Sequence, residues 1–397
     1  MIAVKRIHRS LCGLGFVAVV GALSLTACGG GGGGGDAAVP MAKSSYAVGR
    51  ISGFGSIVIN GVHYQEGKAS VVDEDGEARS AADLKLGMVV EVKADEIGET
   101  NSVKSATAQN IMLASLIRGP VESVGTDGLV VLGQTVKVTN TTVFDEQLTG
   151  GLAAIKAGNV VRVYGTFEAS TGIYTASRID LQDNPQFYRL RGAVAAYDAT
   201  AKTLRVGNAT IDVSGVTVPD GLKVGSLVRV KLQTTQVKGA WVAVGLKLGL
   251  FEPQNNDHTE VEGVITDFTS SSVFSVNGLP VDASKAAFPD GTAAIVKGAR
   301  VEVEGAIVNG TLVATKVKIE TDDQDEHNGF DVEGVISAVD AAKSTFVVRG
   351  VTVSYAGNVN FVGGAAADLK KDVKVEVHGT LSADHTVLTA TRIEFKH

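Results

Sequence analysis

The chain has 397 residues, of which 44% are hydrophobic, 20% are charged and only 5% are aromatic, and its formal net charge is −7. This length is too great for one ordinary hydrophobic core and sufficient for several small domains. The acidic balance argues against a nucleic-acid partner, because nucleic-acid binding depends on Lys and Arg side chains that neutralise phosphates.

The N-terminal segment has the organisation of a bacterial export signal. A basic start at residues 5–9 precedes an apolar run from Leu11 to Leu23. This run is shorter than the roughly 20 residues that span a bilayer, and it fits the apolar region of a signal peptide. The cysteines of the chain, Cys12 and Cys28, lie in or beside this run, so the rest of the chain has no disulfide framework.

The tetrapeptide Leu25-Thr26-Ala27-Cys28 resembles a bacterial lipobox. The resemblance implies that residues 1–27 are a lipoprotein signal peptide and that acyl chains on Cys28 anchor the protein to a membrane. Because Gly29 rather than Asp follows the cysteine, it also implies the outer membrane of the cell envelope. The alternative is an ordinary secretory signal that is cleaved after a small residue.

An unbroken glycine run from Gly29 to Gly35 follows the cysteine. The run contains the G-x-G-x-x-G pattern, but no strand precedes it and no periodic helix follows, so it does not indicate a dinucleotide site. We expect no cofactor and interpret residues 28–45 as a flexible tether.

The remainder of the chain is predicted to be all-β. The stretch from Val296 to Glu320 shows this most clearly, since apolar and polar residues alternate on both sides of Asn309-Gly310. Alternation with a period of two predicts strands with one buried face, and an Asn-Gly pair between two such runs predicts a hairpin.

The same module recurs five times, and a fixed period of this kind indicates a repeat architecture. The opening glycines lie 70 to 73 residues apart, at Gly49, Gly119, Gly192, Gly263 and Gly334. A second anchor follows in each module, at Gly87, Gly158, Gly225, Gly298 and Asp372. The change from Gly to Asp predicts a left-handed backbone at this anchor, because Asp tolerates that conformation. The modules, named copies one to five below, are residues 46–113, 115–182, 189–248, 260–320 and 331–396.

Each copy is predicted to form five strands, with a longer connection after the third strand. Residues such as Phe288 and Ala293-Ala294-Ile295 in this connection suggest a short helical turn that caps one end of a barrel. Five strands with this insertion resemble the oligonucleotide/oligosaccharide-binding (OB) barrel. A five-bladed propeller is the alternative, although modules of this length exceed the usual blade of about 40–50 residues.

The linkers at residues 183–188, 249–259 and 321–330 are polar, which favours copies that fold as separate domains. A barrel of about 65 residues with few aromatic side chains is nevertheless only marginally stable alone. We therefore expect neighbouring copies to share interfaces.

The repeated segments resemble a bacterial envelope family known as domain of unknown function 5666, in which such modules recur in tandem behind a lipobox. The resemblance rests on the opening GRISGFGSIVINGVHY, the glycine-anchored VEV strand and the final strand TATRI. It covers nearly all of the chain after Ser45, and copy three departs from it most. The resemblance implies no activity.

Copy three is an exception to the acidic balance, since nine Lys or Arg residues against three Asp give it a net charge of +6. It also contains the single tryptophan, Trp241. One interpretation is a patch for an anionic ligand such as an acidic glycan, which would stack on Trp241 and contact Arg229, Lys231 and Lys238. The alternative, which residue statistics favour, is a core position for Trp241 in a basic barrel that is balanced by acidic neighbours.

Metal and catalytic motifs have little support. The acidic run from Glu320 to His327 does not have the spacing of a calcium loop, and Asp73-Glu74-Asp75-Gly76 is interpreted as a hairpin turn. His378 and His385 straddle the last hairpin without a third ligand for a metal. The H-E-x-x-H and G-x-S-x-G motifs do not occur in the sequence.

The sequence therefore predicts a non-catalytic, lipid-anchored envelope protein that serves as a scaffold, adhesion or binding surface, with a glycan or an envelope protein as its partner. Two alternatives remain. One is a carbohydrate-binding module centred on copy three, and the other is an envelope enzyme whose site lies between copies.

Overall fold

The computed structural model of the chain describes residues 44–100, 103–251, 255–320, 330–382 and 386–396. Within these ranges the regular structure is strand, apart from three short 3₁₀ helices, which confirms the predicted all-β class. The signal peptide, Cys28 and nearly all of the predicted tether lie outside the described residues.

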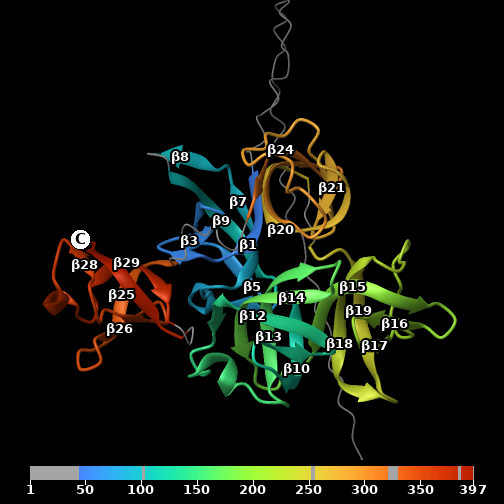
Figure 1. The fold of residues 1–397 in the computed structure, drawn as a ribbon, viewed down its shortest axis with the longest axis horizontal. Coiled ribbons are helices and arrows are strands. Elements are labelled where there is room, and N and C mark those ends of the chain that lie inside the picture. The colour runs from blue at the N-terminus through green and yellow to red at the C-terminus, as the bar shows by residue number, and fades with distance from the viewer. Residues whose placement is uncertain (1–43, 101–102, 252–254, 321–329, 383–385, 397) are drawn as a thin grey trace, which may run out of the picture. The chain divides into compact units, whose positions relative to one another are not determined.

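Each copy contributes its own group of strands (Figure 1). Copy one contains β1 (Ser44–Arg50), β2 (Gly53–Phe54), β3 (Ile57–Ile59), β4 (Val62–Gln65), β5 (Ser70–Val72), β6 (Ala78–Arg79), β7 (Val89–Asp95), β8 (Gly98–Thr100) and β9 (Val103–Leu113). Copy two contains β10 (Ile117–Val124), β11 (Gly128–Val131), β12 (Gln134–Phe144), β13 (Val160–Glu168) and β14 (Ile173–Leu181). Copy three contains β15 (Tyr188–Asp198), β16 (Thr203–Val206), β17 (Ala209–Asp212), β18 (Leu227–Val237) and β19 (Ala240–Leu248).

The last two copies repeat this arrangement. Copy four contains β20 (Asn256–Ser270), β21 (Val273–Val276), β22 (Leu279–Asp282), β23 (Arg300–Val308) and β24 (Thr311–Ile319). Copy five contains β25 (Phe330–Asp340), β26 (Thr345–Val348), β27 (Val351–Ser354), β28 (Asn360–Val362), β29 (Lys374–Leu381) and β30 (Leu388–Phe395). Figure 1 views the barrel of copy four, in orange, nearly along its axis, and β20, β21 and β24 follow its wall.

The strands of copies two to five close in the same order, which copy four illustrates, and copy one follows it with a first strand divided into β1 and β2. The first strand, β20, pairs antiparallel with both the second, β21, and the fourth, β23. The third strand, β22, pairs antiparallel with β21 and in parallel with the fifth, β24, which pairs antiparallel with β23. The sheet thus returns to its first strand as a closed barrel of the OB type, which confirms the predicted fold and excludes the propeller.

In all five copies the second anchor ends the pairing between the first and fourth strands in the same way. The anchor residue has a positive φ throughout, between 70° at Asp372 and 89° at Gly298, as its sequence predicts. Its N–H donates to a first-strand carbonyl in each copy, for example from Gly298 to Ile265 and from Asp372 to Ile336, both at 2.9 Å. The turn therefore fixes where the fourth strand starts along the first.

The opening glycine makes room for a side chain from the turn between the second and third strands. A Cβ at Gly49 or Gly263 would overlap the side chain of Asn60 or Asn277, respectively. Both asparagines have a positive φ of 51°, and their amides donate to the carbonyl that precedes the glycine, at 3.3 Å and 3.2 Å. The opening glycine and the turn residue therefore act together to tie the hairpin to the first strand. Copy five uses Arg349 in the same place, since its Nε donates to the carbonyl of Glu333.

Short 3₁₀ helices follow the third strand in copies two and five, as predicted, and also in copy one. They are η1 (Ala81–Asp83), η2 (Gly151–Ala154) and η3 (Ala366–Asp368). Copy four differs from the prediction, because residues 283–299 form turns without a helix. Ile295 in this connection is nevertheless 1% exposed and contributes to the core. The apolar residues of the connection therefore indicated a buried segment and not a helix.

The copies are joined by strand pairing, which corrects the expectation that they are separate domains. β1 pairs in parallel with β20, β2 pairs in parallel with β25, and β10 pairs antiparallel with β15. Each pair joins the first strand of one copy to the first strand of another. The buried apolar residues accordingly form two main clusters, one mostly of copies one, four and five and the other of copies two and three. The expected interfaces exist, and two of the three strand pairs connect copies that are distant in sequence.

A fourth-strand glycine provides a test of barrel closure. The pairing of the fourth with the fifth strand shifts register at Gly165, Gly305 and Gly379, and a Cβ at Gly305 would overlap the carbonyl oxygen of Val313. We predict that Gly305→Ala lowers the free energy of unfolding by about 2–4 kcal/mol, because the bulge must open to admit a methyl group.

Urea-induced unfolding followed by circular dichroism measures this change. Gly67→Ala is the matched control, since no atom lies within 4 Å of the added Cβ, and it is expected to alter stability by less than about 0.5 kcal/mol. Equal stability of the two variants would contradict the proposed role of the bulge.

Candidate functional site

The acidic turn of copy one is locally ordered by its own first residue. Asp73 accepts hydrogen bonds from the N–H groups of Asp75 and Glu77 at 2.9 Å and 3.1 Å and from Arg79 at 2.6 Å. Gly76 takes a φ of 82°, which closes the turn between β5 and β6. The side chains of Glu74 and Asp75 are thereby directed away from copy one, as the contacts below show.

Asp75 lies among cations from two other copies. Its carboxylate pairs with Arg118 of copy two at 2.8 Å and with Lys231 of copy three at 2.5 Å. Arg189, also of copy three, donates to the same carboxylate. Burial alone would raise the pKa of Asp75, but the hydrogen bonds from Lys231, Arg118 and Arg189 outweigh it and hold the pKa well below its ordinary value.

Glu74 occupies the adjoining part of the same junction. It accepts a hydrogen bond at 2.9 Å from the N–H of Ser115 and another from the hydroxyl of that residue. Burial opposes ionisation, yet the nearby charge of Arg162 and the Ser115 hydroxyl lower the pKa of Glu74. Arg191 of copy three lies 3.7 Å from Glu91, so acids of copy one face cations of copies two and three across the whole junction.

A cavity of about 640 Å³ opens beside this junction, and we call it the junction cavity. Its charged lining comprises Glu74, Asp75, Arg189, Arg191, Arg229, Lys231 and Lys247. The remaining lining is Met112, Leu190, Gly215, Val216, Thr217, Val230, Val244, Gly245 and Leu246. The lining contains five cations and two acids, and one of the cations, Arg191, also faces Glu91 outside it, while the alternate residues of the strands make part of the wall apolar.

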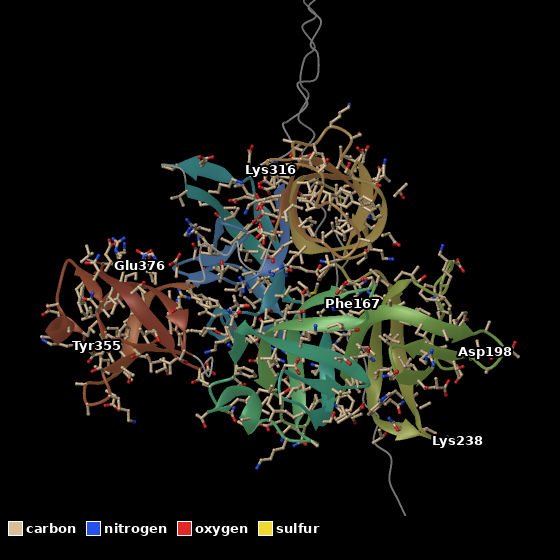
Figure 2. The ribbon with its side chains drawn as sticks, in the orientation of Figure 1. Phe167, Asp198, Lys238, Lys316, Tyr355 and Glu376 are labelled. Atoms are coloured by element: carbon tan, nitrogen blue, oxygen red, sulfur yellow. The ribbon has the colours of Figure 1, made fainter. Side chains whose placement is uncertain are left out.

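The structure separates the four residues that the sequence marked on copy three. Arg229 and Lys231 both line the junction cavity. Lys238 instead lies at the exposed tip of the hairpin between β18 and β19 (Figure 2). Trp241 is 9% exposed and meets the ring of Tyr188 edge-on, with 5.5 Å between the ring centroids. It belongs to the core and does not line the cavity, so stacking of a glycan on Trp241 is not supported.

The acidic turn makes contacts between copies that the sequence interpretation missed. Residues 73–76 do form a turn, but their two outward acids also balance the basic copy three. This agrees with the alternative in which copy three is balanced by acidic neighbours. The available signal was charge complementarity between a strongly acidic turn and the one basic copy.

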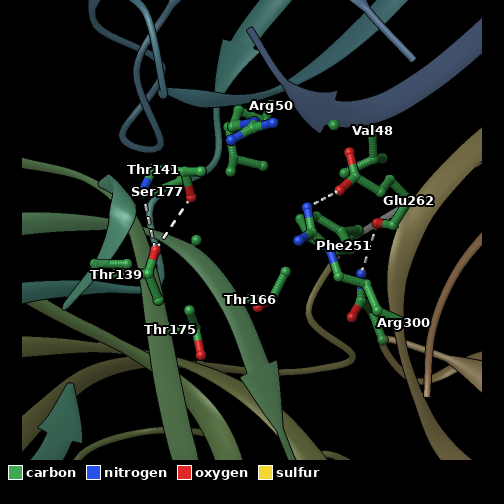
Figure 3. A pocket seen from close by; sticks show the side chains of 15 residues that line it. Val48, Arg50, Thr139, Thr141, Thr166, Thr175, Ser177, Phe251, Glu262 and Arg300 are labelled. Carbon is green, nitrogen blue, oxygen red and sulfur yellow. Dashed lines mark hydrogen bonds and ion pairs between the residues drawn. The ribbon is translucent and has the colours of Figure 1, made fainter. Parts of the chain in front are cut away.

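A second, smaller cavity of about 40 Å³ is lined by residues of copies one, two and four (Figure 3). Figure 3 shows Arg300 directed at Glu262, with which it forms an ion pair, and Thr139 beside Thr141, whose hydroxyls lie 3.1 Å apart. This volume has room for a few water molecules, so the cavity is a polar junction rather than a ligand site.

Copy four carries a ladder of acids on neighbouring strands. Glu302 lies opposite Glu262 on β20 and opposite Lys318 on β24. Burial and the charges of Glu260 and Glu320 raise the pKa of Glu302 to about 8, and Lys318 offsets only part of this effect.

Metal ligands do not gather in the part of the chain that the structure describes: it has no group of three or more His, Cys, Asp or Glu residues arranged to hold a metal ion. His378 pairs there with Asp331 and lies 3.5 Å from Glu376. His385 and residues 321–327 of the acidic run lie outside the described residues.

None of the described helices has the length and apolarity needed to cross a membrane.

The fold defines a tandem array of small five-stranded barrels. A family described as domain of unknown function (DUF5666) matches residues 47–103, 118–180, 262–318 and 333–394, which together exceed half of the chain. The chain therefore belongs to the DUF5666 family. The matches fall in copies one, two, four and five; copy three lies outside them, although its barrel has the same strand order. No curated protein matches the chain.

Loss of the Asp75 carboxylate is expected to destabilise the protein near neutral pH. Asp75→Asn leaves three converging cations without their counter-ion, so we predict a decrease of about 1–3 kcal/mol in the free energy of unfolding at pH 7. The folded pKa lies below the unfolded value of about 3.9, so this contribution is present above pH 3.9 and is lost as the pH falls toward the folded value.

Urea titrations at pH 7 and pH 3 test this, with the difference between wild type and Asp75→Asn expected to shrink at the lower pH. Asp127→Asn, an exposed change of the same chemistry, serves as the control. An unchanged urea midpoint for Asp75→Asn at pH 7 would show that the ion pairs of Asp75 do not contribute to stability.

Glu302 is expected to behave in the opposite way. Because its folded pKa of about 8 lies above the unfolded value of about 4.3, its ionisation costs stability as the pH rises from about 4.3 to about 8. We predict that Glu302→Gln stabilises the protein by about 1–3 kcal/mol at pH 9 and has little effect at pH 4. Thermal melts across this range measure the difference, and a variant that is less stable than wild type at pH 9 would show that the raised pKa is incorrect.

Proposed function

We propose that this DUF5666 protein is a non-catalytic, lipid-anchored component of the bacterial outer membrane whose barrels act as a scaffold or binding surface. The observation that carries the anchoring is the tetrapeptide Leu25-Thr26-Ala27-Cys28, which follows a basic start and an apolar run and precedes a glycine-rich segment. Diacylation of Cys28 supplies two chains, which is what stable anchoring requires, since one chain binds a membrane only marginally.

The scaffold role is supported by the way in which the copies are joined. Three strand pairs between first strands connect copy one to copies four and five, and copy two to copy three. Ion pairs add to them, as Lys104 of copy one lies 3.4 Å from Glu260 and 3.5 Å from Glu304 of copy four. These interfaces compensate for the absence of disulfides, which small exported domains otherwise often need.

A non-catalytic role agrees with the chemistry of the acids at the junction. The pKa of Glu74 and of Asp75 is lowered by cations that belong to other copies, so these carboxylates are held ionised as counter-ions between barrels. General acid or base catalysis would instead favour a carboxyl group whose pKa is tuned toward the working pH. Glu302 has such a pKa, but it lies in a ladder of like charges rather than in the lining of either cavity described above.

Replacement of the lipidated residue tests the proposal. In cells fed a labelled fatty acid, Cys28→Ser is expected to lose the label and to move from the outer-membrane fraction to the soluble fraction, because the acyl chains are its attachment. Cys12→Ser is the control, since Cys12 lies in the apolar run rather than at the lipobox cysteine. Retention of label and membrane association by Cys28→Ser would refute lipid anchoring at this residue.

A further inference from the structure

We propose that a third cavity, which lies between copies one and four and is called the apolar cavity below, binds the alkyl chain of a single-chain amphiphile such as a fatty acid. The inference names a ligand class for the binding role proposed above, and it rests on that role. It does not require lipidation of Cys28, because the cavity is formed by the barrels and by the linker between copies three and four.

The apolar cavity lies where the two main core clusters of the protein meet, and its volume is about 300 Å³. Val48, Val261 and Val276 of its wall belong to the cluster of copies one, four and five, whereas Leu250 belongs to the cluster of copies two and three. Phe251 packs against both clusters. The two cores therefore come together here without filling the space between them, and ligand sites commonly occur where domains meet in this way.

The apolar cavity has a buried floor and an exposed mouth. Val48 of β1 lies opposite Val261 of β20 in the parallel pairing of these strands, and each side chain is 1% exposed. Leu248, Pro280 and Gly310, which also line the cavity, are exposed. An elongated ligand can therefore place its apolar part on the floor and leave its other end at the mouth, in water.

The polar side chains of the lining are already engaged with the protein. Among the described lining residues these are Tyr46 and Asn277. The hydroxyl of Tyr46 donates to Glu91 at 2.6 Å, and the amide of Asn277 donates to the carbonyl of Glu262 and accepts from the N–H of Val264, both at 3.2 Å. A polar group that entered the cavity would give up its hydrogen bonds to water without a free side chain to replace them, so the wall selects an apolar ligand.

The volume of the cavity fits one alkyl chain. An apolar cavity of about 150 Å³ in a protein core stays dry and holds a benzene molecule, so a volume of about 300 Å³ has room for roughly twelve carbon atoms. The two chains of a phospholipid exceed this volume, whereas the chain of a medium-length fatty acid matches it. The wall is mostly aliphatic, and burial of the chain against it supplies the favourable free energy of binding.

Calorimetric titration of the full-length Cys28→Ser protein tests the proposal in the absence of detergent, which would itself compete for the cavity. The ligands are octanoate, decanoate and dodecanoate, each below the concentration at which it forms micelles. We expect one molecule to bind per protein, with an affinity that rises about fourfold for each added methylene group. Dodecyltrimethylammonium is expected to bind with an affinity comparable to that of dodecanoate, because the head group stays at the mouth.

A filling substitution, made in the same Cys28→Ser protein, locates the ligand. Leu279→Trp places a larger side chain in the cavity and is expected to weaken dodecanoate binding by at least about tenfold. Val351→Trp is the matched control, since Val351 follows the turn glycine of copy five as Leu279 follows that of copy four, is likewise partly buried, and lies outside the cavity. Its affinity is expected to equal that of the parent protein.

A substitution at the mouth keeps the test decisive if the tryptophan variants do not fold. Leu248→Asp adds a carboxylate to the rim of the cavity and is expected to weaken dodecanoate binding severalfold through desolvation and like-charge repulsion. Val244→Asp is its control on the same strand, because Val244 is 40% exposed, close to the 38% of Leu248, and lies outside the apolar cavity.

Three results would overturn the inference: no saturable binding of dodecanoate, an affinity that does not increase with chain length, or an equal loss of affinity in a cavity variant and its control. None of them bears on anchoring, because the labelling of Cys28 is measured separately. Conversely, wild-type protein that carries no lipid label but binds dodecanoate would refute the anchoring proposal and leave the ligand site intact.

Discussion

The whole array depends on the first strand of each barrel, which forms hydrogen bonds along both of its edges. In copy four, β20 pairs with β21 on one side and with β23 on the other, and this pairing closes the barrel around a core that includes Phe274. The opening glycine leaves room for a side chain of the turn between the second and third strands, and the left-handed anchor ends the pairing with the fourth strand. The repeated positions therefore record requirements of packing and of backbone geometry.

The same strand also joins the barrels, and this explains how copies with small cores form one body. Where an edge of the first strand is not paired with its second strand, it pairs with the first strand of another copy, as between Val48 and Val261, while the opposite edge stays paired within each barrel. Domains of this size bury only about 60% of the surface that their unfolded chains expose, so shared surface is a substantial gain. Interfaces thus replace the disulfides that the folded part lacks.

The sequence predicted what local geometry determines. Asn309-Gly310 forms its hairpin with φ values of 51° and 79°, and Asp372 takes the left-handed conformation of the glycines that it replaces. Pairing between copies could not be predicted, because strands that lie about 210 residues apart carry no pattern that names their partner. The candidate site was found in part for the same reason. Local charge marked Arg229 and Lys231, but only the tertiary structure brings Asp75 of copy one to them.

Asp75 and Glu302 show why residue type alone does not assign the site. Both are carboxylates that lie near charges from other strands or copies. The pKa of Asp75 is lowered because it faces three cations. The pKa of Glu302 is raised to about 8 because burial is reinforced by neighbours that are mainly acids. Burial opposes ionisation in both, so the neighbours decide the sign. An internal ion pair of this kind is weak support for stability as such, because desolvation consumes much of its attraction. Its clearer consequence is geometric: the Asp75 carboxylate of copy one fixes where Arg189 and Lys231 of copy three lie.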